Sequence, residues 1–431
     1  MKKYGKYIET GYKYVPILPA KWNLKLGLTL FVENKNKNDS LQNLSQLQFC
    51  YGSIIKKSNQ SIDDDGIEAL KKHTIVECND IILNGLNLNY DFISQRVAIV
   101  LESGIITSAY LSLRCRNTYN PFYANYLLKS LDAQKVFHGM GSGLRLTLGY
   151  SEFSRIKFPV PPRAEQDQIV RFLDWKTAKI DKLIEGYKKQ IVLLEERKRS
   201  FVFNYVTKGF TPSAKQRNSD IYWLDYVPRH WQTKTIAQLF SEVKCKNSGM
   251  KEKNLLSLSY GIIKQRDINA TEGLLPKSFE GYNIIEKDDI VLRLTDLQND
   301  HKSLRTGISK EKGIITSAYL TIRNKSNNDS DYLHLFLHSF DLVKGFYNIG
   351  ASGVRQSLNW DVIKTLKVLI PPIDEQKKIV SSIKEEYQII EHSKHSIQKQ
   401  IALLKEYRTR LISDVVTGQI DVRDEKVPET R

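Results

Sequence analysis

The chain has 431 residues, a formal net charge of +17 and 41% hydrophobic residues. This length favours more than one domain, and the hydrophobic fraction is sufficient for packed cores. No run of about 18 apolar residues is present and the basic start lacks an apolar stretch, so we expect neither a membrane-spanning helix nor a secretory signal. The excess of lysine and arginine favours a polyanionic partner such as nucleic acid, and the alternative is a basic protein without one.

The cysteines indicate the redox environment. Cys50, Cys78, Cys115 and Cys245 lie far apart and form no CxxC pair. Scattered thiols of this kind are typical of a reducing compartment. We therefore expect free thiols, a cytoplasmic location and no zinc site built from these cysteines.

An internal duplication dominates the chain. Residues 104–114 read GIITSAYLSLR, and residues 313–323 read GIITSAYLTIR. Trp22 and Trp231 keep the same offset of 209, and from Gly141 onward the offset is 210, so one residue is gained in between. A period this long excludes a solenoid and predicts two copies of one module in a pseudo-two-fold molecule.

Each copy is expected to be a mixed domain followed by a long helix. Short strand candidates bounded by turn residues surround one amphipathic helix, at residues 121–137 in the first copy and 331–347 in the second. The strand candidates are residues 80–83, 97–101, 110–113 and 156–159, with counterparts at 290–294, 306–309, 319–322 and 366–370. We predict the α+β class, with domains at 1–160 and 210–370, long helices at 161–209 and 371–418, and a tail at 419–431.

The two long segments have the period of a coiled coil. Apolar residues recur at alternating steps of three and four after a proline pair, and Gly209 and Gly418 suit the C-terminal stops. We predict that the two helices pair antiparallel within one chain, and the alternative is a coil between two chains. The predicted seam comprises Leu173, Ile180, Ile184, Tyr187, Ile191, Leu194, Phe201, Ile383, Tyr387, Ile390, Ile397, Ile401, Leu404 and Leu411.

Sequence signatures of catalysis are missing. The chain has no phosphate-binding GxxxxGK[ST] loop, no GxGxxG after a strand and no GxSxG. His334 and His338 are four residues apart, but no glutamate follows His334, so packing is favoured over a metal pair. The tripeptide at 120–122, NPF, matches only part of an amino-methyltransferase tetrapeptide. We expect this chain to hold no catalytic residue, no metal and no cofactor.

Loops rich in amides and cations occur at matching places in both copies. These are residues 51–57 and 260–266, 85–96 and 294–305, and 139–145 and 350–355. Amides and guanidinium groups can read base edges, while lysines and arginines hold phosphates. The alternative is that these are solvated turns that support the fold. The candidate DNA-binding residues are Lys56, Lys57, Asn87, Asn89, Gln95, Arg96, Arg145, Lys264, Gln265, Arg266, Gln298, Asn299, His301, Lys302, Arg305, Arg355 and Gln356.

Several stretches together resemble the specificity subunit of a type I restriction-modification system. The pattern PPxxEQ opens both long helices, which end in YVTKG at 205–209 and VVTGQI at 415–420. The stretches 223–231, 291–300 and 351–366 and both copies of GIITSAYL also resemble that family. The first copy departs from the pattern, because Asn84 stands where the second has Arg293, and its 141–148 segment lacks counterparts of Gln356 and Trp360.

The resemblance implies a non-catalytic, sequence-specific DNA-binding subunit. It implies that each domain is a DNA target-recognition domain for one half of a bipartite, asymmetric site, and that the helices set the spacing and dock two methyltransferase subunits. Restriction subunits with motor and nuclease parts are implied as further partners, with S-adenosylmethionine, ATP and Mg²⁺ on the partners. The competing functions are a coiled-coil scaffold with incidental charge, and a self-sufficient nuclease or methyltransferase.

Overall fold

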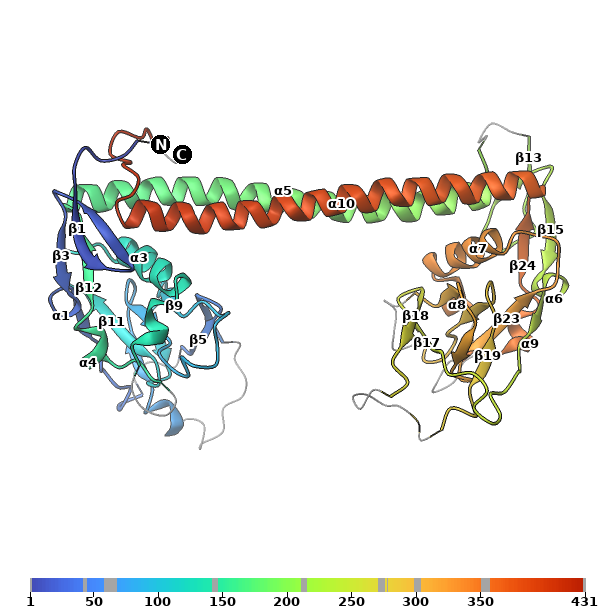
Figure 1. Ribbon diagram of the computed structural model, residues 1–431, viewed down its shortest axis with the longest axis horizontal. Helices are drawn as coiled ribbons and strands as arrows, with labels where there is room; N and C mark the ends of the chain where they lie inside the picture. Colours follow the sequence, from blue (N-terminus) through green and yellow to red (C-terminus); the bar gives the residue numbers. More distant parts are fainter. Residues whose placement is uncertain are drawn as a thin grey trace. The chain divides into compact units, whose positions relative to one another are not determined.

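The computed structural model describes residues 2–41, 45–57, 68–141, 146–210, 215–269, 276, 278–297, 304–349 and 357–428. The chain forms two units, Met1–Tyr187 with Gln398–Arg431, and Lys188–Ile397. Each unit contains one globular domain and part of both long helices (Figure 1). None of the helices in the described ranges has the length and apolar character needed to cross a membrane.

The first domain is built from short strands and few helices. In chain order its elements are β1 Tyr7–Tyr12, β2 Val15–Pro19, β3 Asn23–Leu26, α1 Gly27–Leu30, β4 Phe31–Glu33, β5 Leu47–Cys50, β6 Ser53–Lys56, β7 Thr74–Val76, β8 Ile81–Leu83, β9 Val97–Ile99, β10 Gly104–Ile106, β11 Leu111–Cys115, α3 Pro121–Ala133, η1 Val136–Gly139, α4 Tyr150–Phe153 and β12 Lys157–Val160. Helix α5, Arg163–Lys208, follows.

A four-stranded antiparallel sheet in the order β4-β11-β8-β9 forms the centre of the first domain. Helix α3 packs against β9 and β11. The core beside them is aromatic: the ring of Phe31 meets those of Tyr119, Phe153 and Phe158 edge-on at 5.5, 5.3 and 5.7 Å between centroids. Of the repeat motif at 104–114, the end therefore lies in β11 of the central sheet, whereas its start forms β10, which pairs with β7.

The second domain repeats this plan. Its elements are β13 Gln216–Asn218, β14 Tyr226–Pro228, β15 Gln232–Thr235, α6 Ile236–Leu239, β16 Phe240–Glu242, β17 Leu255–Ser259, β18 Ile262–Arg266, β19 Asn283–Ile285, β20 Ile290–Leu292, β21 Thr306–Ile308, β22 Gly313–Ile315, β23 Leu320–Asn324, α7 Ser330–Leu342, α8 Gly345–Asn348, α9 Trp360–Ile363 and β24 Lys367–Ile370. Helix α10, Ile373–Val416, follows.

The central sheet of the second domain has the order β16-β23-β20-β21, which matches the first domain strand for strand. A second four-stranded sheet, β18-β17-β22-β19, includes one parallel pair, β17 with β22. The corresponding strands of the first domain form two separate pairs, with an isolated parallel bridge between Gln46 and Ile105. The duplication and the predicted α+β class with two long helices are confirmed.

One predicted element is wrong in detail. The single helices expected at 121–137 and 331–347 are each broken, at Lys135 and at Lys344. Both lysines have left-handed backbone conformations, with φ of 61° and 59°. A short helical turn, η1 or α8, starts after each lysine, so that Phe137 and Phe346 turn back into the core.

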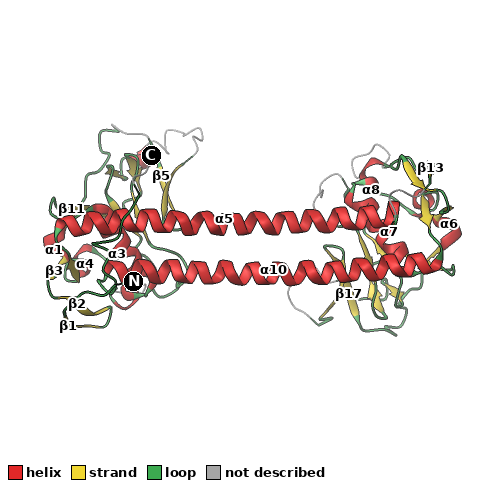
Figure 2. Ribbon diagram, turned by 90° about the horizontal axis from the view of Figure 1, so that it is seen from above, coloured by secondary structure: helices red, strands yellow, loops and turns green. Residues whose placement is uncertain are grey.

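The two long helices run side by side in opposite directions within each unit (Figures 1 and 2). In the second unit, Lys198 of α5 pairs with Glu391 at 2.9 Å, and Lys394 of α10 pairs with Glu195. In the first unit, Arg408 of α10 pairs with Asp181 of α5 at 3.1 Å. These three cations interrupt the apolar seam, and their ion pairs across it favour one register of the two helices.

The predicted seam residues are buried or half-buried without exception, whereas exposed apolar residues occur elsewhere on the same helices. Fully buried examples are Leu173 on α5 and Ile390 on α10. Because the seam faces a helix of the same chain in both units, the intramolecular pairing accounts for the apolar period.

Replacing Gly186 by alanine should stabilise the protein. Gly186 is exposed in the middle of α5, and a Cβ added to it meets no atom within 4 Å. Alanine is about 1 kcal/mol more favourable than glycine inside a helix. Chemical denaturation should therefore show a gain of about 1 kcal/mol in the free energy of unfolding. Gly418→Ala is the contrasting variant, because its φ is +77° and the new Cβ falls 2.5 Å from Pro19, so it should destabilise.

A glutamine joins each domain to the start of a long helix. In the first unit, the Gln166 Oε1 accepts from the backbone N–H of Asn120 at 2.7 Å, and its Nε2 donates to the carbonyl of Pro161 at 2.9 Å. Gln376 repeats this in the second unit, accepting from the backbone N–H of Asp329 at 2.9 Å. Asn120 and Asp329 are the N-caps of α3 and α7. The PPxxEQ motif therefore fixes the domain helix to the long helix.

The neighbouring glutamate of the motif holds the beginning of each repeat. Tyr4 donates its hydroxyl proton to Glu165 at 2.6 Å, and the indole N–H of Trp231 donates to Glu375 at 3.1 Å. Burial, followed by the hydrogen bond to Glu165, raises the pKa of Tyr4 well above its ordinary value. The motif glutamate thus anchors the first domain at the start of α5 and the second domain at the start of α10.

Candidate nucleic-acid interface

The structure places the β8–β9 loop of the first domain beside the residues that follow the candidate segment 139–145. The β8–β9 loop, residues 84–96, lies beside residues 146–148: Leu88 N–H donates to the carbonyl of Leu146 at 3.1 Å, and Leu148 N–H donates to that of Gly85 at 2.9 Å. A Cβ on Gly85 would lie 2.4 Å from the Leu148 carbonyl oxygen, so glycine allows this close approach. Two segments far apart in sequence therefore share one edge of the domain.

The β5–β6 turn reaches the end of the same loop. Gly52 packs on Gln95, because a Cβ there would lie 2.5 Å from the Gln95 Cγ. The ammonium group of Lys129, on α3, donates to the Gly52 carbonyl at 2.9 Å, and burial lowers its pKa to about 8. The side chain of Tyr51 at this turn is exposed. The turn that precedes Lys56 and Lys57 is thereby held against the β8–β9 loop.

The second domain repeats both contacts. Leu358 N–H donates to the carbonyl of Leu294 at 3.0 Å, in the β20–β21 loop, residues 293–305. Gly261 of the β17–β18 turn packs on Leu304, at 3.0 Å from an added Cβ to the Leu304 Cβ. The β20–β21 loop thus meets Leu358 and the β17–β18 turn in the same way as the β8–β9 loop meets Leu148 and the β5–β6 turn.

The candidate DNA-binding residues fall into four groups. Exposed ones are Lys56, Lys57, Asn87, Lys264, Gln265 and Arg266, and half-buried ones are Asn89 and Gln95. Outside the described residues lie Arg145, Gln298, Asn299, His301, Lys302, Arg355 and Gln356. The remaining two, Arg96 and Arg305, are buried, with 2% and 0% of their surface exposed.

Arg96 binds its own loop instead of facing solvent. Its Nη1 donates to the carbonyls of Leu86 at 2.7 Å and Asn84 at 3.1 Å, and its Nη2 donates to those of Asp91 at 2.9 Å and Asn87 at 3.3 Å. Asp132 of α3 accepts from its backbone N–H at 2.7 Å. The expectation that Arg96 itself contacts DNA is therefore corrected: its guanidinium is occupied by four carbonyls and shapes the loop.

Arg305 plays the same part in the second domain, which corrects its assignment as well. Its Nη1 donates to the carbonyl of Thr295 at 2.7 Å, and its Nη2 to that of Asp296 at 3.2 Å. Its Nε donates to the Tyr347 hydroxyl at 3.1 Å. Asp341 accepts from its backbone N–H, as Asp132 does in the first domain.

An exposed apolar group at the end of the β8–β9 loop was missed at the sequence level. Tyr90, Phe92 and Ile93 have exposed fractions of 76%, 55% and 95%. The only sequence signal is the run NYDFIS, an apolar cluster within an otherwise polar loop. Exposure of such side chains on a strongly charged chain favours a role in binding.

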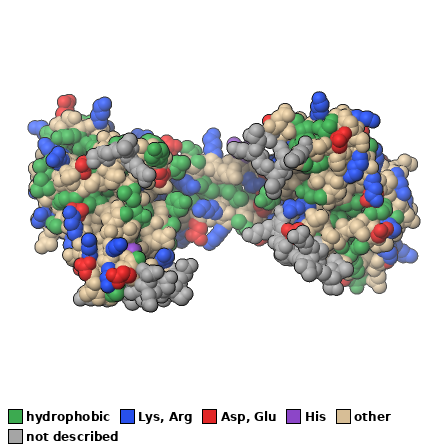
Figure 3. Space-filling model, turned by 90° about the horizontal axis from the view of Figure 1, so that it is seen from below, with side chains coloured by type: hydrophobic (Ala, Val, Ile, Leu, Met, Phe, Trp, Pro, Cys, Tyr) green, Lys and Arg blue, Asp and Glu red, His purple; other side chains and the backbone are tan. Residues whose placement is uncertain are grey.

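Positive charge is spread over both domains. On the face seen in Figure 3, lysine and arginine side chains are interspersed with apolar and acidic ones over each domain. Lys264, Gln265 and Arg266 add exposed polar groups along β18. This distribution suits many separate phosphate contacts better than one small anionic ligand.

Comparison with known proteins identifies the two domains. Residues 65–193 and 228–402, more than half of the chain, match the family described as type I restriction modification DNA specificity domain. The chain belongs to this family. It is 24% identical over 378 residues to the type I restriction enzyme MjaVIII specificity subunit of Methanocaldococcus jannaschii. The aligned region covers 83% of each chain.

Solved structures share the fold of these specificity domains. The HsdS subunit from Thermoanaerobacter tengcongensis matches with a TM-score of 0.52 and 12% identity, over 95% of this chain and 99% of that one. A chain from structural work on complex assembly and conformational transition of the type I R-M system matches with a TM-score of 0.62 and 11% identity, over 94% and 99%. At this level of identity the likeness establishes the common fold.

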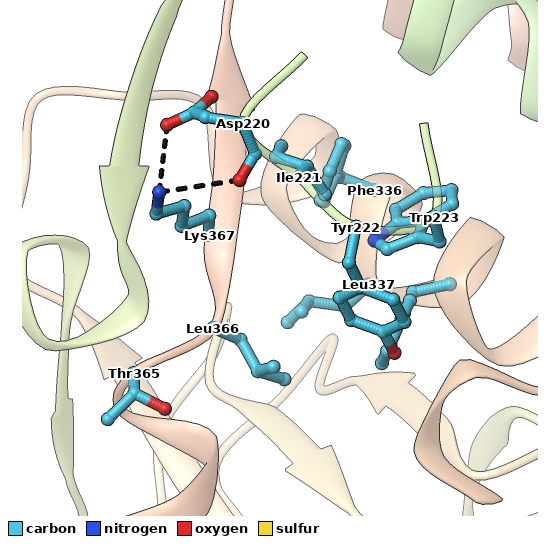
Figure 4. Close-up of a pocket in the computed structure, with 10 residues that line it drawn as sticks. Asp220, Ile221, Tyr222, Trp223, Phe336, Leu337, Thr365, Leu366 and Lys367 are labelled. Atoms are coloured by element: carbon cyan, nitrogen blue, oxygen red, sulfur yellow. Dashed lines mark hydrogen bonds and ion pairs between the residues drawn. The ribbon is translucent and has the colours of Figure 1, made fainter. Parts of the chain in front are cut away.

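The second specificity domain contains an apolar pocket of about 220 Å³ (Figure 4). Trp223, Phe336 and Tyr222 line it together with Leu337 and Leu366. At its edge the ammonium of Lys367 pairs with the carboxylate of Asp220 at 3.0 Å. The two charges neutralise each other, so the pocket offers apolar packing rather than acid–base chemistry.

The two histidines of α7 lie close together within the second specificity domain. The rings of His334 and His338 are 5.9 Å apart, and His338 Nδ1 is 3.4 Å from the Thr306 hydroxyl. Burial lowers the pKa of His334 to about 3 and that of His338 to about 4, with further lowering of the latter by Lys198 and Arg199. Among the described residues no group of three or more His, Cys, Asp or Glu side chains could hold a metal ion.

Replacing His334 by asparagine should make the second specificity domain more resistant to acid. Asn125 occupies the matching place in the first domain. Unfolded His334 takes up a proton below about pH 6.5, whereas the folded side chain does so only near pH 3. The contribution of neutral His334 to the free energy of unfolding is therefore fully present above about pH 6.5. It decreases as the pH falls below about 6.5, by up to about 1.4 kcal/mol per pH unit. Unfolding measured at pH 7.5 and pH 5 should show a smaller loss for His334→Asn.

The exposed His392 on α10 provides the control, since His392→Asn should leave the acid loss unchanged. Burial raises the pKa of Asp341 to about 6, which stabilises the folded domain on acidification and offsets part of the histidine effect in every variant. An equal acid loss in the wild type and in His334→Asn would show that His334 does not limit stability at low pH.

Proposed function

We propose that the chain is the non-catalytic DNA sequence-specificity subunit of a type I restriction-modification complex. Each specificity domain reads one half of a bipartite, asymmetric DNA site. The observation that carries this proposal is the pair of equivalent loops, β8–β9 and β20–β21, which two buried arginines hold in the same way. The loops share the support of a buried arginine but differ in sequence, as at Asn84 and Arg293. Two loops with the same backbone support but different sequences suit the recognition of two different half-sites.

The long helices set the distance between the half-sites and dock two methyltransferase subunits. Exposed apolar residues outside the seam support docking: these are Leu183, Leu403 and Tyr407 in the first unit and Val192, Leu193 and Ile389 in the second. Apolar residues at such places on a helix are typical of a surface for another protein. The partners carry S-adenosylmethionine, and restriction subunits with ATP and Mg²⁺ complete the assembly.

Binding of the reconstituted complex to duplex DNA tests the proposal. Affinity should fall steeply with salt concentration, because lysines and arginines release counterions from the phosphates. A duplex with the site should bind about 10³-fold or more tightly than one without it. Binding that depends on neither salt nor sequence would favour a coiled-coil scaffold. Cleavage or methylation by this chain alone, with Mg²⁺ or S-adenosylmethionine, would favour a self-sufficient enzyme.

A further inference from the structure

The end of the β8–β9 loop combines apolar side chains with a closely held backbone. Tyr90, Phe92 and Ile93 project from a loop whose carbonyls converge on the buried guanidinium of Arg96. An apolar group on a loosely held loop could fold back onto the domain. A held loop keeps these side chains exposed, which lowers the ordering cost of binding.

Further contacts fix the residues between the apolar side chains. The Asp91 carboxylate accepts from the backbone N–H of Ile93 at 3.0 Å and of Ser94 at 2.9 Å. These hydrogen bonds, with the one from Ser94 foremost, lower the pKa of Asp91 to about 2. The ring of Phe92 stacks on that of His138 at 4.8 Å, and His138 Nε2 lies 2.9 Å from the Asp91 carbonyl oxygen. The backbone and one of the three apolar side chains are thus held by side chains of the same domain.

We propose that Tyr90, Phe92 and Ile93 form an apolar contact between the first specificity domain and the bases of its half-site, and that Arg96 is the positioning residue for this contact. The inference rests on the proposed function and names residues that carry part of its specificity. DNA offers apolar surface at the thymine methyl groups of the major groove and on base faces at a kinked step. Side chains of this size can meet either.

Two observations favour DNA over a protein partner for this surface. The loop packs at Gln95 against Gly52 of the β5–β6 turn, which precedes the exposed cations Lys56 and Lys57. It also shares an edge, through Leu88 and Leu146, with residues 146–148, which directly follow the candidate segment 139–145. The exposed apolar residues of the long helices are a separate surface on other elements.

The test uses the reconstituted complex carrying Tyr90→Ser, Phe92→Ser and Ile93→Ser together. Binding is measured to the cognate duplex and to duplexes with single base-pair changes in either half-site. Discrimination in the half-site read by the first domain should fall roughly 10- to 100-fold, with the other half-site unchanged. Leu101→Ser is the matched control, because Leu101 is 63% exposed in the same domain and lies outside the loop. It should leave both half-sites unchanged.

Arg96→Lys tests the positioning role. Lysine keeps the charge but cannot hold four carbonyls at once. The variant should lose discrimination in the first half-site while the second half-site, read by the other domain, stays as in the wild type. If Arg96→Lys fails to fold, the triple serine variant decides the matter alone, since its residues lie at the surface.

The outcomes separate the inference from the proposed function. Wild-type discrimination in both half-sites by the triple variant overturns the inference alone, as does a loss of partner-subunit binding with discrimination intact. A wild-type complex that fails to discriminate overturns the proposed function and the inference with it. Uracil in place of thymine in that half-site removes only methyl groups. A weaker wild-type complex then assigns the contact to the methyl groups, and an unchanged one assigns it to the base faces.

Discussion

A complex whose specificity chain has one extra heptad in both α5 and α10 should recognise two half-sites that lie further apart. Seven helical residues add about 10.5 Å, which corresponds to at most about three base pairs at roughly 3.4 Å each. A whole heptad preserves the apolar seam and the faces that the helices present. Mapping of the methylated sites in cells should therefore show the same two half-sites with a longer unread spacer.

Three added base pairs also turn the second half-site by roughly 100° around the duplex, because B-DNA has about 10.5 base pairs per turn. We therefore expect weaker binding at the new spacing than the wild type shows at its own. The control adds the heptad to α5 alone, which leaves the two helices unequal in length and should abolish recognition. An unchanged spacer in the double insertion would exclude a role of the helices in setting the distance.

Replacing Arg323 by methionine should destabilise the second domain by about 2 kcal/mol, because the arginine is 45% exposed while its partner carboxylate is buried. The Asp289 carboxylate is 1% exposed and accepts from the Arg323 Nε and Nη2, both at 2.7 Å. Removal of the guanidinium leaves a buried carboxylate with the backbone N–H of Glu286 as a remaining donor. An ion left without its partner in the interior is far more costly than a lost surface ion pair. Denaturant unfolding of the second domain measures this loss.

Arg266→Met provides the matched control, because Arg266 is exposed on β18 of the same domain and its loss should change stability by less than about 0.5 kcal/mol. The double variant Asp289→Asn with Arg323→Met removes the buried charge and should recover part of the stability. A loss of similar size from Arg266→Met and Arg323→Met would contradict a stabilising role of Arg323 for the buried Asp289 carboxylate.

The repeat in the sequence predicted which segments matter but not what they do. Asp80 and Asp289 start the matching stretches before β8 and β20, and Arg114 and Arg323 end the GIITSAYL stretches. The structure joins them in two equivalent ion pairs: Arg114 Nε donates to Asp80 Oδ1 at 2.8 Å, and Arg323 Nε donates to Asp289 Oδ1 at 2.7 Å. Strand pairing brings together residues 34 positions apart in sequence. Periodicity and spacing within either stretch contain no information on that pairing.

The assignment of Arg96 and Arg305 to DNA contact failed for a related reason. An arginine in a polar, amide-rich stretch is exposed far more often than it is buried. Burial here depends on the carbonyls of the loop converging on one point and on a carboxylate from a distant helix, Asp132 or Asp341. The matching offset of the two arginines could have indicated a shared structural role, since the residues around them differ.

The long helices were easier to predict because their signal is local. The steps of three and four, the proline pairs and the terminal glycines placed α5 and α10 within the expected segments. The break after α3 was missed because Lys135 is left-handed without being glycine or asparagine. Tertiary packing of Phe137 in the core, which the sequence pattern does not contain, accompanies that turn.

We propose that two domains of one chain read two different half-sites. Methylation mapping is the decisive measurement, on DNA from cells that carry the complete system with either the wild-type chain or the triple serine variant of the β8–β9 loop. The maps should show a bipartite, asymmetric site, with relaxed sequence preference in one half only for the variant. A continuous or palindromic site, or a variant that alters both halves equally, would contradict it.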